Sequence, residues 1–243
     1  MMNTINTKRL LLYIFIPTAV VSLSYLILGH FCSMPYILLF CILGTFTLVP
    51  IELGFIISAS KKEHGSFSLK SALTGQIKMQ IWKIILIAFL FFSLAGLLSV
   101  TIATLENNLL SQVRQAVLNH LPVGFDWQNI EYLKTFSKPV LIITCIYYCI
   151  FNVIIGPVTE ELFFRGYLTS HYKKQNGFTP ILIAILFSLY HFWLPFNNVF
   201  RILVFAPVAY VAYKKKNIYI SMCFHCMCNL FSVVGFILAV AAK

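Results

Sequence analysis

Charged residues are scarce in this chain of 243 residues, and acidic residues are the scarcest of them. Asp, Glu, Lys and Arg together make up 10% of the sequence, and only seven residues are acidic. Hydrophobic residues make up 60%, and the mean hydropathy is +0.87. A soluble globular surface could not accommodate so much apolar area. Several apolar runs reach the roughly 18 to 20 residues that span a bilayer. The composition therefore excludes a soluble protein and predicts an all-α, polytopic transmembrane helical bundle.

Because negative charge is scarce, the formal net charge is +11. The basic residues do not form the continuous basic face that nucleic-acid binding requires. They lie in short segments between apolar runs, where they set the topology and contact anionic headgroups. These clusters are Lys8 and Arg9, Lys61 and Lys62, Lys173 and Lys174, and Lys214, Lys215 and Lys216. We expect the lipid bilayer as a partner, no nucleic acid, and a cytoplasmic N-terminus.

A disulfide framework is also missing, since most of the seven Cys lie inside expected spans. Cys223, Cys226 and Cys228 surround His225, but on a helix they point in different directions and cannot jointly hold one ion. We interpret them as small apolar packing residues.

Residues 1–138 are expected to form an N-terminal membrane-spanning half with polar loops. Its spans are Leu10–Leu28, Pro35–Ile57 and Ile81–Leu105. The polar stretch 106–138 carries apolar residues at helical spacing, which is typical of an interfacial amphipathic helix. Glu52 lies near the end of the second span, and we interpret it as an interfacial carboxylate that reaches water or Lys61.

Residues 139–243 carry all the candidate chemistry and are expected to form a catalytic membrane domain. Gly156 and Pro157 interrupt its first apolar run, which leaves two alternatives. The run is either two spans or one long helix from Pro139 to about Tyr172 with a kink at the proline. The later spans are Pro180 to about Leu194 and Ile218 to about Ala242, with a further run between them.

Charge and depth favour the single long helix. It places both C-terminal basic clusters on the cytoplasmic side, as the charge rule requires. At 1.5 Å per residue, Glu160 then lies about 18 Å from the helix end at Tyr172. The same rise places His191 about 18 Å and His225 about 10 Å from the starts of their helices. All three depths are measured from one face, so we favour seven crossings, and two separate spans would give eight.

Glu160, Glu161 and Arg165 form a polar cluster in an apolar background. An ionisable residue at membrane depth is costly and indicates a functional site. Neighbouring helical residues diverge by about 100°, so we expect that the two carboxylates cannot face one site. Glu161 and Arg165 are spaced i,i+4 with the acid first, which favours an ion pair. This predicts a structural pair and leaves Glu160 as the chemical carboxylate.

Two later helices carry matching polar pairs. Phe187 and His191 share one face, and so do His225 and Asn229. The second pair can donate together to a developing oxyanion. Alternatively, His225 binds a metal and Asn229 orients it. Three polar groups in three successive apolar helices, at converging depth, indicate a single site.

These motifs resemble a known family. Glu160-Glu161-x-x-x-Arg165, Phe187-x-x-x-His191 and His225-x-x-x-Asn229, in this order, are similar to the motifs of the CPBP or Abi intramembrane proteases. That family includes the type II CAAX prenyl endopeptidases and bacteriocin-processing or immunity proteins. The resemblance covers roughly residues 139–242 and implies endopeptidase activity in a membrane cavity. It implies that Glu160 activates water, that His191 holds this water or shuttles its proton, and that His225 and Asn229 stabilise the oxyanion.

The resemblance leaves the cofactor open. Glu160, His191 and His225 could supply three zinc ligands with an open fourth position. A metal-free glutamate mechanism is the alternative that we favour, since no His-x-x-x-His pair is present. The expected substrate is a membrane-associated peptide or a lipidated protein, and the expected location is the bacterial cell membrane. The sequence predicts no oligomeric state.

Two other functions compete with the protease. One is a non-proteolytic bacteriocin-immunity or scaffold protein that keeps the same residues. The other is a transporter that uses Glu160 as a proton relay, although the chain has no internal repeat of the kind that many transporters show.

Overall fold

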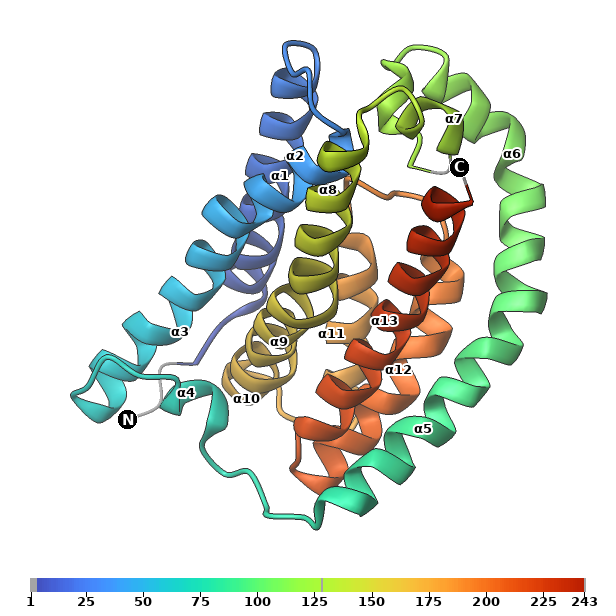
Figure 1. Cartoon of the computed structure of the whole chain (residues 1–243). Helices are drawn as coiled ribbons and strands as arrows, with labels where there is room; N and C mark the ends of the chain where they lie inside the picture. The colour runs from blue at the N-terminus through green and yellow to red at the C-terminus, as the bar shows by residue number, and fades with distance from the viewer. Residues whose placement is uncertain (1–3, 128, 243) are drawn as a thin grey trace.

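The protein is described here by a computed structural model, which covers residues 4–127 and 129–242. The helices lie side by side in one bundle (Figure 1). Within the described ranges, Ile5 and Tyr172 also form an isolated β-bridge. The α-helices are α1 (Thr7–Gly29), α2 (Tyr36–Leu43), α3 (Val49–His64), α4 (Lys70–Leu73), α5 (Ile81–Leu98), α6 (Thr104–Leu118), α7 (Ile130–Leu133), α8 (Lys138–Ile150), α9 (Gly156–Glu160), α10 (Thr169–His171), α11 (Thr179–Leu189), α12 (Asn198–Lys215) and α13 (Tyr219–Ala241). A short 3₁₀ turn, η3, covers Val123–Phe125.

Several of these helices are joined without a break by π-helical turns. The turns are η1 (Gly44–Leu48), η2 (Ser99–Ala103), η4 (Phe151–Ile155) and η5 (Glu161–Leu168). Counting the joined pieces together, five helices of the described chain are long and apolar enough to cross a membrane. They are Thr7–Gly29, Tyr36–His64, Ile81–Leu118, Lys138–His171 and Tyr219–Ala241. The protein is thus an all-helical integral membrane protein.

The expected seven to eight spans are not confirmed. In the described chain α11 is a shorter apolar helix of 11 residues. At 1.5 Å per residue it is about 16 Å long, roughly half of a bilayer core. The span expected from Pro180 to Leu194 therefore ends early, at Leu189.

The single long helix is confirmed, since Lys138–His171 runs continuously for 34 residues. Proline in a helix interior lacks an N–H and clashes with the preceding turn. Here Pro157 follows the π-helical turn η4, whose wider hydrogen bonding accommodates it. A second π-helical stretch, η5, begins at Glu161, directly after Glu160.

The predicted end of the third span at Leu105 is wrong. The helix continues through η2 into α6 and ends at Leu118, running along α12 and α13 (Figure 1). The apolar residues expected on a separate interfacial helix belong to this extension, where Leu109 and Val113 are exposed. The one acidic residue there, Glu106, is buried and accepts the backbone N–H groups of Val199 and Phe200 at 3.1 and 2.9 Å.

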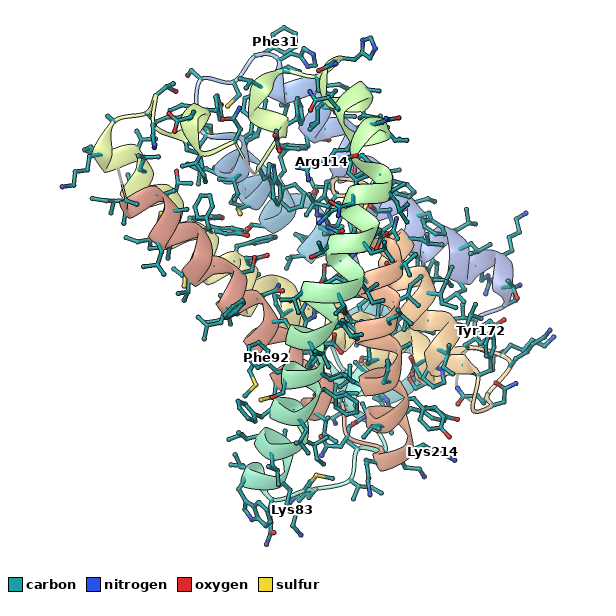
Figure 2. The ribbon with its side chains drawn as sticks, turned by 90° about the vertical axis from the view of Figure 1, so that its right-hand side faces the viewer. Phe31, Lys83, Phe92, Arg114, Tyr172 and Lys214 are labelled. Atoms are coloured by element: carbon teal, nitrogen blue, oxygen red, sulfur yellow. The ribbon has the colours of Figure 1, made fainter. Side chains whose placement is uncertain are left out.

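The long helix Lys138–His171 is the centre of the bundle, because its middle part contacts α3, α11, α12 and α13. Gly166 packs directly against the backbone of α4, since an added Cβ would lie 2.7 Å from the carbonyl oxygen of Ala72. In Figure 2, Lys83 and Lys214 lie toward one end of the bundle and Phe31 lies at the other. A backbone hydrogen bond from Lys173 to Ile5 brings the first and third basic clusters together.

Candidate active site

Glu161 and Arg165 lie in contact on η5, fully inside the bundle. Glu161 Oε1 is 3.3 Å from Arg165 Nη1, and both side chains are buried. The guanidinium carbon of Arg165 lies 4.2 Å from the centroid of the Phe187 ring, at the distance of a cation–π contact. The i,i+4 spacing therefore does produce an ion pair, and an aromatic face covers its cation.

His225 of α13 lies between the two glutamates. Its Nδ1 is 3.1 Å from Glu161 Oε1, and its Nε2 is 3.7 Å from Glu160 Oε2. Both carboxylates therefore contact His225, on different nitrogens of its ring, although only Glu160 lines the cavity described below. The helix changes from α to π between them, and a π turn holds more residues, so adjacent side chains diverge less than in an α-helix.

His191 lies just beyond the end of α11. Its Nδ1 is 2.8 Å from the carbonyl oxygen of Phe187, the residue paired with it in the sequence motif. A carbonyl only accepts, so Nδ1 donates, and the Nε2 of a neutral ring is left with a lone pair. The ring of His191 makes T-shaped contacts with the rings of Phe187 and Tyr190.

Asn229 lies one helical turn after His225 on α13. Its Nδ2 donates to the backbone carbonyl of Asn152 in η4, at 2.7 Å. One N–H of the side-chain amide therefore donates to the backbone. The same nitrogen carries a second N–H group.

The four predicted catalytic residues line one cavity of about 510 Å³. Glu160, His191, His225 and Asn229 reach it from three segments of the chain, whereas Glu161 and Arg165 are not among its lining residues. Most of its wall is apolar or aromatic, as ligand cavities of this size generally are. The aromatic lining includes Phe40, Trp127, Phe151, Phe187, Trp193, Phe205 and Phe236. The motifs are thus brought together, with the ion pair behind the cavity wall.

Residues 142–231 match the family model described as type II CAAX prenyl endopeptidase Rce1-like. The resemblance to the CAAX-protease family is confirmed. The matched segment contains all three motifs, from Glu160 to Asn229, and residues 1–141 lie outside it. No curated protein and no solved structure matches the chain.

A second carboxylate, Glu52, lines the same cavity from α3, outside the segment matched to the CAAX-protease family. It is fully buried, and the hydroxyl of Tyr190 donates to its Oε1 at 2.5 Å. The interpretation of Glu52 as an interfacial carboxylate is therefore wrong. Its helix continues to His64, which places Glu52 about 18 Å from the helix end. The depth count used for Glu160 would have identified it.

Sequence reasoning also missed Arg201, which lies inside the matched segment. It lines the cavity from the first turn of α12. Its Nη1 lies 3.1 Å from both the carbonyl oxygen of Ser188 and Oδ1 of Asn198. These acceptors are neutral, so the guanidinium is held in place without a carboxylate among them. The signal was available, since Arg201 is the one charged residue between His191 and Lys214.

The side chains considered for zinc are Glu160, His191 and His225. Across residues 4–127 and 129–242, no three His, Cys, Asp or Glu side chains are grouped so that they could hold a metal ion. His191 Nδ1 is engaged with a carbonyl and His225 Nδ1 with Glu161, which leaves only Nε2 of each ring for a metal. As placed, the three side chains are not grouped as a zinc site, and the metal-free mechanism stays a prediction, with zinc as its alternative.

Proposed function

We propose that the protein is an intramembrane endopeptidase, which hydrolyses a peptide bond of a membrane-associated peptide or lipidated protein by means of a glutamate-activated water. One observation carries the proposal. Glu160, His191, His225 and Asn229 line a single cavity inside an apolar helical bundle, in a segment matched to a CAAX prenyl endopeptidase family.

Glu160 is the general base of the proposed reaction. Unlike Glu161, it lines the cavity and has no arginine beside it within ion-pair distance in the described chain. Water in the cavity attacks the carbonyl carbon of the scissile bond, and Glu160 takes a proton as the C–O bond forms.

His225 and Asn229 stabilise the oxyanion that this attack produces. Asn229 supplies the N–H that is not bonded to Asn152. Donation from Nε2 of His225 requires the imidazolium form, because its Nδ1 faces Glu161. Fixed donors in a cavity that excludes bulk water stabilise such a charge far better than water does.

Collapse of the tetrahedral intermediate breaks the C–N bond, and the leaving nitrogen takes up the proton held by Glu160. We assign the transfer of this proton to His191, whose Nε2 carries the lone pair. Glu160 is then a carboxylate again, and the products are a new C-terminus and a new N-terminus.

The substrate is proposed from the surroundings of the cavity. Its aromatic wall and its place in a membrane bundle suit an apolar or lipidated chain. The description of the matched family, prenyl endopeptidase, suggests a prenylated segment as the first probe.

The test compares peptide termini in membranes of cells that express the wild-type protein, Glu160→Gln or His191→Ala. We expect termini that appear only with the wild type, although both variants are present in the membrane at equal amounts. Glu131→Gln is the control, because this carboxylate is exposed and lies outside the cavity. Identical termini in all four samples would overturn the proposal and favour the scaffold function.

A further inference from the structure

Glu52 has one engaged and one unengaged carboxyl oxygen. Oε1 accepts the Tyr190 hydroxyl, while Oε2 has no hydrogen-bond partner in the described part of the chain. The side chain is fully buried and lines the same cavity as Glu160. Buried acceptors nearly always have a donor, and because Glu52 lines the cavity, a molecule that enters the cavity could supply one.

The surrounding residues offer no such donor. None of the ion pairs within residues 4–127 and 129–242 includes Glu52. The one cation in the cavity wall apart from histidine, Arg201, donates instead to Ser188, Asn198, Leu194 and Phe196.

We propose that Glu52 is a further substrate-binding residue of the active site, whose Oε2 accepts a backbone N–H of the bound peptide. This inference rests on the proposed function. A peptide entering a membrane cavity loses the water bound to its N–H groups, and each of them needs a new acceptor. The scissile carbonyl faces His225 and Asn229, which are donors. An extended peptide also presents N–H groups, and these require an acceptor on another wall, which α3 supplies.

A purely structural role for Glu52 is the competing explanation, and it requires only one of the two carboxyl oxygens. Tyr190 packs against the ring of His191, with centroids 5.3 Å apart, so Glu52 could position His191 through Tyr190. For that role Tyr190 needs only one acceptor oxygen, which Gln also provides. Glu52→Gln presents its NH₂ group in place of the second oxygen, so a donor meets the substrate N–H. Tyr190→Phe removes the phenol bond and leaves both carboxyl oxygens.

The first experiment measures binding of the peptide without cleavage. A farnesylated fluorescent peptide with a CAAX-type C-terminus is titrated against full-length Glu160→Gln protein in lipid nanodiscs, with and without Glu52→Gln. We expect the second substitution to weaken binding roughly tenfold or more, because a substrate N–H is left buried without an acceptor. Equal Kd values would overturn the inference.

The second experiment measures cleavage of an internally quenched form of the same peptide by the wild type, Glu52→Gln, Tyr190→Phe and the control Glu131→Gln. We expect Glu52→Gln to raise KM, and Tyr190→Phe to change KM little. Equal effects of the two substitutions would overturn the inference and make Glu52 a positioning residue. Where Glu52→Gln fails to fold, Glu52→Asp replaces it, since it keeps the carboxylate but withdraws it from the cavity, and we again expect a higher KM.

The two proposals fail differently. Cleavage by Glu160→Gln at the wild-type rate would overturn the proposed function. Loss of cleavage in Glu160→Gln together with an unchanged Kd and KM for Glu52→Gln would overturn the role of Glu52 alone.

Discussion

The side chain of Asn229 completes the hydrogen bonding of the backbone at Asn152, to which its Nδ2 donates at 2.7 Å. In the π turn η4, the N–H of Gly156 bonds to the carbonyl of Phe151, five residues earlier. The matching partner for Asn152 would be residue 157, which is proline and has no N–H. Asn229 takes its place and joins α13 to the helix that carries Glu160.

Asn229→Ala is expected to lower both stability and activity. It leaves a buried carbonyl without a donor, which costs about 1–3 kcal/mol, and it removes the proposed oxyanion donor, which costs roughly 10² to 10³ in kcat. Thermal unfolding in nanodiscs and cleavage of the farnesylated peptide measure the two effects. Asn152→Ala keeps the carbonyl and should keep the wild-type Tm. A Tm for Asn229→Ala equal to that of the wild type would contradict this account of the bond.

Substitution by Gln is expected to lower the stability of the protein at Glu161 and its activity at Glu160. Glu161→Gln leaves Arg165 buried without its counter-ion, and breaking a buried pair in this way costs about 3–5 kcal/mol. Glu160→Gln leaves no such charge and should unfold close to the wild type while losing cleavage. Chemical unfolding of both variants provides the comparison, and similar stabilities would contradict the division between them.

The double variant Glu161→Gln/Arg165→Met tests the same ion pair by removing both of its charges. Removing both charges of a buried ion pair leaves no uncompensated charge, which is the cause of the loss in the single variant. We expect it to recover most of the stability lost in Glu161→Gln, and a double-mutant cycle gives the coupling. A double variant as unstable as the single one would show that Arg165 is held by its aromatic contacts instead.

Much of the site could be predicted from the sequence because helical spacing fixes which residues share a face. That rule identified the Glu161–Arg165 pair. The estimate of depth from the helical rise predicted that Glu160, His191 and His225 lie at one site, and all three line one cavity. Both tools assume regular α-helices of known length.

The errors arose where that assumption failed. The spacing rule did not predict that both glutamates contact His225 from either side of the π turn that begins at Glu161, and no composition signal marks such a turn. Glu52 was placed near water because its span was ended at Ile57, whereas the polar residues up to His64 continue the helix. The contacts of Glu106 join chain segments distant in sequence, which spacing alone does not bring together. The partners of Arg201 lie at the end of α11, in the turn between α11 and α12 and at the start of α12, where regular helical spacing does not apply.

Glu106 is expected to stabilise α12 as a cap supplied by another helix. The residue before α12, Asn197, makes no side-chain cap bond, and Glu106 accepts the N–H groups of Val199 and Phe200 instead. Losing a capping acceptor costs about 0.5–2 kcal/mol, and a negative charge at a helix N-terminus adds to the effect. Glu106→Ala should therefore lower the Tm, and Glu106→Gln should lower it less. If both variants unfold like the wild type, the cap contributes nothing.

Pro157→Ala is expected to separate stability from activity. Alanine restores an N–H at position 157 and relieves the clash of the proline ring, so the π turn η4 is no longer required. The regained N–H competes with Asn229 for the Asn152 carbonyl, and loss of the π turn rotates Glu160 relative to His225. Misplacement by about 1 Å can cost roughly 10² in rate, so cleavage should fall while the Tm holds or rises. Cleavage at the wild-type rate would mean that the π turn does not set the position of Glu160.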